Sequence, residues 1–140
     1  MNPQAWRRLA GRWTIEATHP GLPGAAITGQ SEFEWLDSQR LLLQRSHFDH
    51  PEIPAAFSVS GIVDGEPAMH YFDVRGVHRV FGVEITETTW RWWNDAPGFA
   101  LRFTGELNDD VTAIDGQAEH SQDDGATWEP DLAMTYRRIA

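Results

Sequence analysis

The sequence predicts an all-β protein whose strands close into a single up-and-down antiparallel β-barrel. Turn-forming residues recur about every 8–12 positions, which is the spacing of short strands joined by tight turns. Several segments alternate apolar and polar side chains, as strands do when one face is buried and the other faces water. No helical segment is available to cover a flat sheet, so we expect the sheet to close on itself.

The elements follow one another with little connecting chain. A short helical turn is expected over residues 3–9, with Asn2 as its cap. The ten expected strands are Gly11–His19, Ala26–Trp35, Arg40–Phe48, Phe57–Val63, Ala68–Val74, His78–Ile85, Thr88–Asn94, Phe99–Asn108, Val111–Ser121 and Leu132–Ile139. Tight-turn residues separate them at positions 36–39, 64–67 and 108–110. We therefore expect one barrel domain over residues 1–140, with a cavity inside, because ten strands leave more room than eight.

Strand alternation distinguishes the two ends of this barrel. If Trp13 lies at one end, the links at 36–39, 64–67, 86–87 and 109–110 lie there too, and all are short. The longest links, at 20–25, 49–56 and 122–131, lie at the other end. Long loops on a rigid scaffold carry binding residues, so we expect function at the end with the long loops, called here the open end.

Composition excludes several classes of function. The net charge of −10 argues against binding to nucleic acid or to anionic lipid. All 11 basic residues are arginines and there is no cysteine, which removes lysine Schiff bases, disulfides and thiolate chemistry. We find neither a signal peptide nor an apolar run long enough to span a membrane, and we expect a cytoplasmic protein with a small-molecule partner.

Gly11-Arg12-Trp13 near the start of the chain is matched by Arg137-Arg138 near its end. This pattern resembles the calycin superfamily of lipocalins and fatty-acid-binding proteins. The resemblance implies that an arginine of the last strand lies over the indole of Trp13 by a cation–π contact and closes one end of the barrel. In that role these residues stabilise the fold and carry no chemistry.

Residues 121–128 read Ser-Gln-Asp-Asp-Gly-Ala-Thr-Trp, which matches the Asp-box pattern known from sialidases. In that family the motif is a structural hairpin remote from catalysis. A carboxylate that caps backbone N–H groups and a glycine at positive φ give the same hairpin here. We expect it between the ninth and tenth strands.

The segment 69–79 is rich in polar groups for a hairpin, and its His70-Tyr71-Phe72-Asp73 followed by Arg75-Gly76 resembles an uncharacterised bacterial lipocalin-like family. That resemblance extends over most of the chain and implies no established activity. Tyr71 and Asp73 would form an acid–base pair if both point inward. Alternatively, Asp73 pairs with Arg75 or Arg79 and only stabilises the turn.

The leading hypothesis is a barrel that binds a small, mostly apolar or aromatic molecule. Arg45 and His47 would anchor its polar part, Trp92 and Phe103 would form the wall, and His19 and His120 would lie at the rim. Tyr71 and Met134 complete the candidate binding residues. No catalytic residue, metal ligand or obligatory cofactor is assigned.

Three alternatives remain open at this stage. An isomerase or lyase would use Tyr71, His70 or Asp73 as acid and base. A haem protein is suggested by similarity to the nitrobindin-like barrel plan, which uses a histidine near the start of its last strand. The corresponding residues 129–134 contain no histidine, so Met134 or His120 would have to substitute. A purely structural interaction module would need a large exposed apolar patch.

Overall fold

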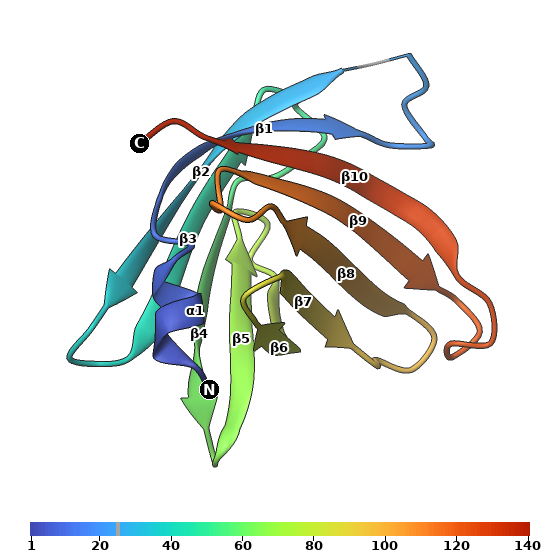
Figure 1. The fold of residues 1–140 in the computed structure, drawn as a ribbon. Coiled ribbons are helices and arrows are strands. Elements are labelled where there is room, and N and C mark those ends of the chain that lie inside the picture. Colours follow the sequence, from blue (N-terminus) through green and yellow to red (C-terminus); the bar gives the residue numbers. More distant parts are fainter. Residues whose placement is uncertain (25) are drawn as a thin grey trace.

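The computed structural model describes residues 1–24 and 26–140, and within them ten antiparallel strands form a closed barrel (Figure 1). Its elements are α1 (Pro3–Arg7), β1 (Gly11–Thr18), β2 (Ile27–Leu36), β3 (Leu41–Phe48), β4 (Ala56–Val63), β5 (Glu66–Asp73), β6 (His78–Ile85), β7 (Thr89–Asn94), β8 (Ala100–Leu107), β9 (Ala113–Ser121) and β10 (Glu129–Arg138). Each strand pairs with its neighbours in sequence, and β1 pairs with β10 to close the barrel. The predicted fold class is confirmed, including the short N-terminal helical turn.

Alternation along the strands is the local cause of this architecture. Along β1, Trp13, Ile15 and Ala17 are buried, while Arg12 before them and Glu16 between them are exposed. The same period of two runs through β2 and β9, as expected for strands with one face toward a core. None of the described residues belongs to a helix long and apolar enough to cross a bilayer.

The strand β9 begins at Ala113 rather than at the expected Val111. Val111 has φ 52° and a buried side chain, so it lies in a turn and not in extended chain. Asn108 stabilises that turn, because its Oδ1 accepts hydrogen bonds from the backbone N–H groups of Thr112 at 2.9 Å and Ala113 at 3.0 Å. The side chain of Asn108 therefore delays the strand by two positions.

The strand β10 begins earlier than expected, at Glu129 instead of Leu132. Glu129 pairs with His120 of β9, and the register then shifts between Pro130 and Ala133. This irregularity accommodates Pro130, which has no N–H to donate to the ladder. It brings Asp131 to the open end of the barrel, where it lines the cavity.

The closed end is sealed by Arg138 and Trp13. The guanidinium carbon of Arg138 lies 4.3 Å from the centroid of the Trp13 ring. Its N–H groups donate to the backbone oxygens of Arg8, Ala10 and Val111 at 2.6, 2.6 and 2.9 Å. Arg138 makes the contact expected from the sequence, whereas Arg137 is exposed on the outer face.

The helix α1 completes this seal. Trp6 and, just after the helix, Leu9 are buried in the barrel core. Arg7 pairs with Asp37 at 2.7 Å, and Arg8 donates to the backbone oxygens of Glu87 and Asp109. Because these three partners lie in the short links between strands, α1 lies across the end that carries the tight turns. Access to the interior is therefore from the opposite, open end.

Candidate functional site

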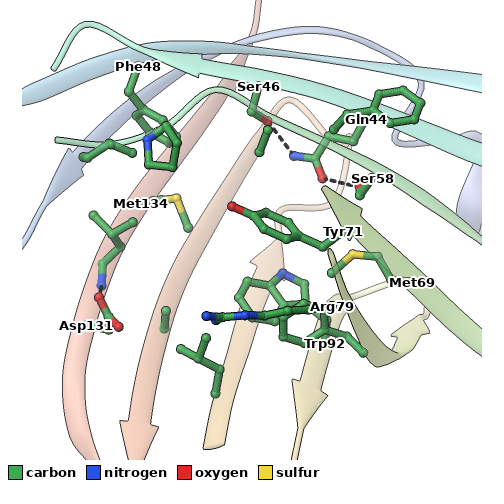
Figure 2. A pocket seen from close by; sticks show the side chains of 18 of the residues that line it. Gln44, Ser46, Phe48, Ser58, Met69, Tyr71, Arg79, Trp92, Asp131 and Met134 are labelled. Carbon is green, nitrogen blue, oxygen red and sulfur yellow. Dashed lines mark hydrogen bonds between the residues drawn. The ribbon is translucent and has the colours of Figure 1, made fainter. Parts of the chain in front are cut away.

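A cavity of about 270 Å³ occupies the open half of the barrel (Figure 2). Its lining residues are Gln44, Ser46, Phe48, Ile53, Pro54, Ala56, Phe57, Ser58, Met69, Tyr71, Arg75, Arg79, Phe81, Trp90, Trp92, Leu101, Ala118, Asp131, Leu132, Met134 and Tyr136. They come from the eight strands β3 to β10 and from the loops at the open end. The lining is largely apolar and aromatic, with two clusters of polar groups inside the cavity and Asp131 at its rim.

The aromatic wall is formed by β6, β7 and β8. Trp92 stacks on Phe103 with a centroid distance of 5.2 Å and an interplanar angle of 13°. Phe81 meets Trp92 edge to face at 4.9 Å, and Tyr71 meets Phe81 in the same way at 6.2 Å. Trp93, the next residue after Trp92, faces outward, where the guanidinium of Arg91 lies over its ring at 5.6 Å. Strand alternation thus divides the tryptophans of β7 between the cavity and the outer surface.

The first polar cluster is neutral and lies on β3 and β4. The Gln44 side-chain amide donates to the hydroxyl oxygens of Ser31 at 3.0 Å and Ser46 at 3.1 Å, and its Oε1 accepts from Ser58 at 3.5 Å. The Tyr136 hydroxyl, buried nearby in the lining, donates to the Met134 sulfur at 3.8 Å, a weak acceptor. This wall therefore offers neutral hydrogen-bonding groups without a net charge.

Sequence reasoning missed the polar group on β3, although a signal for it existed. Leu36 and Leu41 pair directly across the β2–β3 turn, so Phe33 pairs with Gln44. Because Phe33 points inward, Gln44 must also point inward, and Arg45 must point outward. Arg45 accordingly lies on the outer face near Glu32 and Glu34, at 3.7 and 3.4 Å.

The second polar cluster is charged and lies at the β5–β6 end of the cavity. The Tyr71 hydroxyl donates to Asp73 Oδ2 at 2.8 Å, and Arg75 binds the same carboxylate through Nη2 at 2.6 Å and Nε at 3.2 Å. Arg79 pairs with Tyr71 across the strands and also lines the cavity. Asp73 therefore accepts a hydrogen bond from Tyr71 and also binds Arg75, one of the two arginines expected to pair with it.

The pKa values of Tyr71 and Asp73 are shifted in opposite directions. Burial, followed by the hydrogen bond to Asp73, raises the pKa of Tyr71 to about 12. Hydrogen bonds from Arg75 and Tyr71 hold the pKa of Asp73 well below its usual range. At neutral pH Tyr71 is protonated and Asp73 is ionised, and neither has a pKa near that pH.

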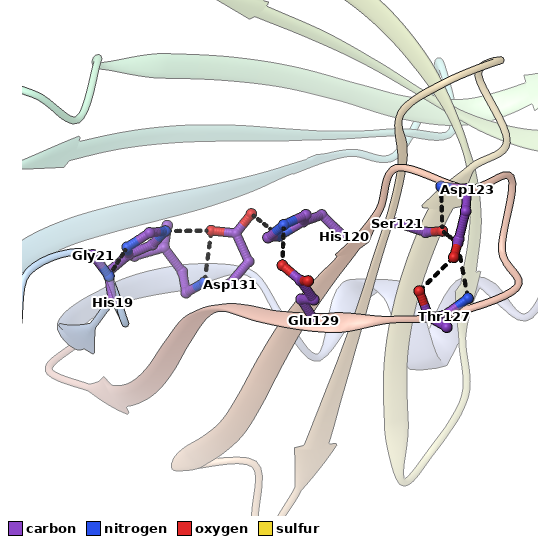
Figure 3. Close-up of polar contacts among 9 residues, drawn as sticks. His19, Gly21, His120, Ser121, Asp123, Thr127, Glu129 and Asp131 are labelled. Atoms are coloured by element: carbon purple, nitrogen blue, oxygen red, sulfur yellow. Dashed lines mark hydrogen bonds and ion pairs between the residues drawn. The ribbon is translucent and has the colours of Figure 1, made fainter.

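The rim of the open end carries a chain of imidazole and carboxylate groups (Figure 3). His19 Nε2 lies 2.9 Å from Asp131 Oδ1, and His120 Nδ1 lies 3.6 Å from Asp131 Oδ2. His120 Nε2 in turn lies 3.4 Å from Glu129. Since Asp131 also lines the cavity, these imidazole and carboxylate contacts connect the β1–β2 loop and β9 to the cavity mouth.

The Asp-box hairpin lies beside this rim and has the expected geometry. Asp123 accepts hydrogen bonds from Ser121 Oγ at 2.7 Å and from the backbone N–H of Thr127 at 2.8 Å. The neighbouring Asp124 accepts from the backbone N–H of Gly98 at 2.9 Å, which ties the β7–β8 loop to the hairpin. All three contacts hold the loops in place, and none of their residues lines the cavity.

The structure therefore distributes the expected binding residues over four locations. Lining the cavity are Tyr71, Trp92 and Met134. Phe103 is buried behind Trp92, and His19 and His120 lie at the rim. Arg45 and His47 are exposed on the outer face of β3, outside the cavity. His70 also faces outward and stacks on His78, so it does not converge with Tyr71 and Asp73.

The cavity does not suit a haem. Among residues 1–24 and 26–140, no histidine lines it. Met134, in the middle of β10, accepts a hydrogen bond from the Tyr136 hydroxyl, while His120 is directed at carboxylates of the rim. Within the same described residues, no group of three or more His, Asp or Glu side chains is arranged to hold a metal ion. We therefore derive no function through either group.

Comparisons with known proteins bear on the fold. No family model matches the chain, and no curated protein sequence matches it. Twelve chains of solved structures match. One is the crystal structure of Rv2717c from M. tuberculosis, with a TM-score of 0.68 and 12% sequence identity, over 98% of this chain and 96% of that chain. At this identity the similarity establishes a shared architecture, a closed antiparallel barrel of ten strands.

Proposed function

We propose that this protein binds a small, mostly apolar molecule with aromatic character inside the barrel. The observation that carries the proposal is the cavity of about 270 Å³ with Trp92, Phe81 and Tyr71 on its wall. Ligand sites are typically concave, apolar pockets of about 300–1,000 Å³ with a few polar groups that orient the ligand. The cavity lies just below that range, which suits a ligand the size of a two-ring aromatic compound.

The barrel plan supports placing this function in a calycin-like context. One end is sealed by the Arg138–Trp13 contact and by α1, so a ligand would enter through the open end. The net charge of −10 speaks against nucleic acid as the partner. A small molecule remains the partner that the geometry favours.

Proton-transfer catalysis is less well supported than binding. General acids and bases work best with a pKa near the operating pH. The pKa of Tyr71 is raised to about 12, and that of Asp73 is lowered below its usual range. His70, the third group that an isomerase or lyase would use, faces away from the cavity. We therefore assign Tyr71 and Asp73 to positioning Arg75 and shaping the cavity.

Calorimetric titration with 2-naphthamide, a neutral two-ring probe, tests the proposal. The variant Ala118→Leu fills part of the cavity, because Ala118 lines it and is buried. Ala113→Leu on the outward-facing side of the same strand is the matched control. We expect the wild type and Ala113→Leu to bind the probe alike, and Ala118→Leu to bind at least about tenfold more weakly, since overlap costs more than about 1.4 kcal/mol.

Native mass spectrometry of protein purified without denaturation provides a second measurement. A retained small molecule in the wild type that is absent from Ala118→Leu would support a cavity ligand. Equal binding of the probe by Ala118→Leu and the wild type, with both variants folded by circular dichroism, would contradict the proposal. So would failure of the ligand-free wild type to bind any two-ring probe.

A further inference from the structure

Arg79 is a cation that lines the cavity. It lies on β6 directly opposite Tyr71 on β5, and both side chains reach into the cavity (Figure 2). Throughout residues 1–24 and 26–140, no carboxylate comes within ion-pair distance of Arg79. Arg75 beside it is bound to Asp73 at 2.6 Å. A half-buried charge without a partner is costly, and an anion in the cavity would relieve that cost.

The two carboxylates of the cavity region are already engaged by other groups. Asp73 accepts hydrogen bonds from Tyr71 and from Arg75, and none of its side chain is exposed to solvent. Asp131, across the mouth, lies 2.9 Å from His19 and accepts a hydrogen bond from the backbone N–H of Leu132. Both carboxylates are therefore engaged by groups other than Arg79, which lines the cavity with its positive charge.

The surroundings of Arg79 define the position of its charge relative to the apolar space. The guanidinium is close enough to the Tyr71 phenol for its charge to oppose the rise in the pKa of Tyr71. Further inside lie Trp90, Trp92 and Met134, which are apolar. A molecule that filled this space with a hydrophobic body would present its other end to Arg79.

We infer that the cavity selects small hydrophobic carboxylates, with the apolar body against Trp92 and the carboxylate bound by Arg79. This inference rests on the proposed function and specifies the class of ligand. Guanidinium binds carboxylate through paired, charge-assisted hydrogen bonds, which are stronger than those between neutral groups. Arg75 also lines the cavity, and it remains bound to Asp73 while Arg79 takes the ligand.

Two probes of the same shape, 2-naphthoate and 2-naphthamide, test this inference by calorimetry at low ionic strength. We expect the wild type to bind the carboxylate at least about tenfold more tightly than the amide, because hydrogen bonds to charged groups exceed neutral ones by about that factor. Arg79→Gln should abolish the preference and leave amide binding unchanged, while Arg79→Lys should retain part of it. Arg91→Gln, on the exposed outer face of β7, is the matched control and should keep the full preference.

The outcomes separate the two proposals. If neither probe binds to the wild type, the proposed function is wrong. If both bind equally, or if folded Arg79→Gln keeps the preference, the cavity binds ligands but the carboxylate inference is wrong. Salt provides a test that needs no variant: raising NaCl from about 0.02 M to about 0.5 M should weaken 2-naphthoate binding and leave 2-naphthamide binding unchanged. Equal salt dependence of the two probes would overturn the inference.

Discussion

Arg138 on the last strand lies over the ring of Trp13 on the first strand, with 4.3 Å between the guanidinium carbon and the ring centroid. The same guanidinium donates to the backbone oxygens of Arg8, Ala10 and Val111. One side chain therefore joins β1, β10, the segment after α1 and the β8–β9 turn. This contact seals the closed end and leaves the opposite end for the cavity.

Replacement of Arg138 should destabilise the barrel without altering the cavity. We expect Arg138→Gln to lower the free energy of unfolding by about 3 kcal/mol, through the loss of charge-assisted hydrogen bonds and the cation–π contact. Arg137→Gln, at the exposed neighbouring position, should change it by less than about 0.5 kcal/mol. Urea denaturation followed by tryptophan fluorescence measures both. Equal effects of the two substitutions would mean that the contact with Trp13 contributes little.

Ionisation of the tyrosines should report that both phenols are buried. The chain has two tyrosines, and burial raises the pKa of both, that of Tyr71 to about 12. In a titration followed at 295 nm, the folded protein should form little phenolate near pH 10, whereas protein in urea should titrate at about pH 10. Because the folded-state pKa values are raised, their contribution to stability should be full below pH 10 and decline above it. A folded-state transition near pH 10 would contradict the burial of Tyr71.

The Asp-box turn should make the free energy of unfolding depend on pH in the acidic range. Hydrogen bonds from Thr127 and Ser121 lower the pKa of Asp123 to about 2. A depressed folded-state pKa means that the contribution of the carboxylate is full above about pH 4 and is lost as the pH falls through about 2. The stability difference between the wild type and Asp123→Asn should therefore shrink as the pH falls from 4 to 2. Asp115→Asn, on the exposed face of β9, is the control, and a constant difference for Asp123→Asn would refute this role.

Asp131 should oppose the binding of an anionic ligand, because it is the negative group across the cavity mouth from Arg79. Asp131→Asn retains an oxygen that can accept the Leu132 N–H and removes the charge. We expect it to tighten 2-naphthoate binding about threefold, in the range of a partly exposed charge interaction, and to leave 2-naphthamide binding unchanged. Calorimetry with both probes measures this, and weaker 2-naphthoate binding by a folded variant would contradict it.

Most of the fold was predictable because its signals are local. Turn residues and period-two alternation located all ten strands, with displaced ends at β9 and β10 where the Asn108 side chain and Pro130 alter the backbone. The site was less predictable. In β3, the consecutive Leu41, Leu42 and Leu43 fit the interior in either phase, so the strand alone does not show whether Gln44 or Arg45 faces inward.

Arg79 illustrates the same limit on the other side of the cavity. The segment 69–79 carries polar side chains in both phases, and the sequence indicated only that Asp73 could pair with Arg75 or Arg79. In the folded barrel the adjacent Arg75 binds Asp73, which leaves Arg79 beside Tyr71 at the cavity. Competition between the two arginines for one carboxylate is settled by the conformation of the β5–β6 turn.

The amino-acid sequence by itself determined the strand number, the up-and-down order, the closed end and the Asp-box hairpin. The strand number, the strand order and the hairpin depend on residues close together in the chain or on a pattern repeated along it, and the closed end follows from the matched Trp13 and Arg138 and from the alternation of short and long links. Only the tertiary structure decided which side chains meet in the cavity, because that depends on the pairing register of every strand and on the closure of β1 against β10. The grouping of Gln44, Tyr71, Arg79 and Asp131 around one space exists only after the barrel has closed.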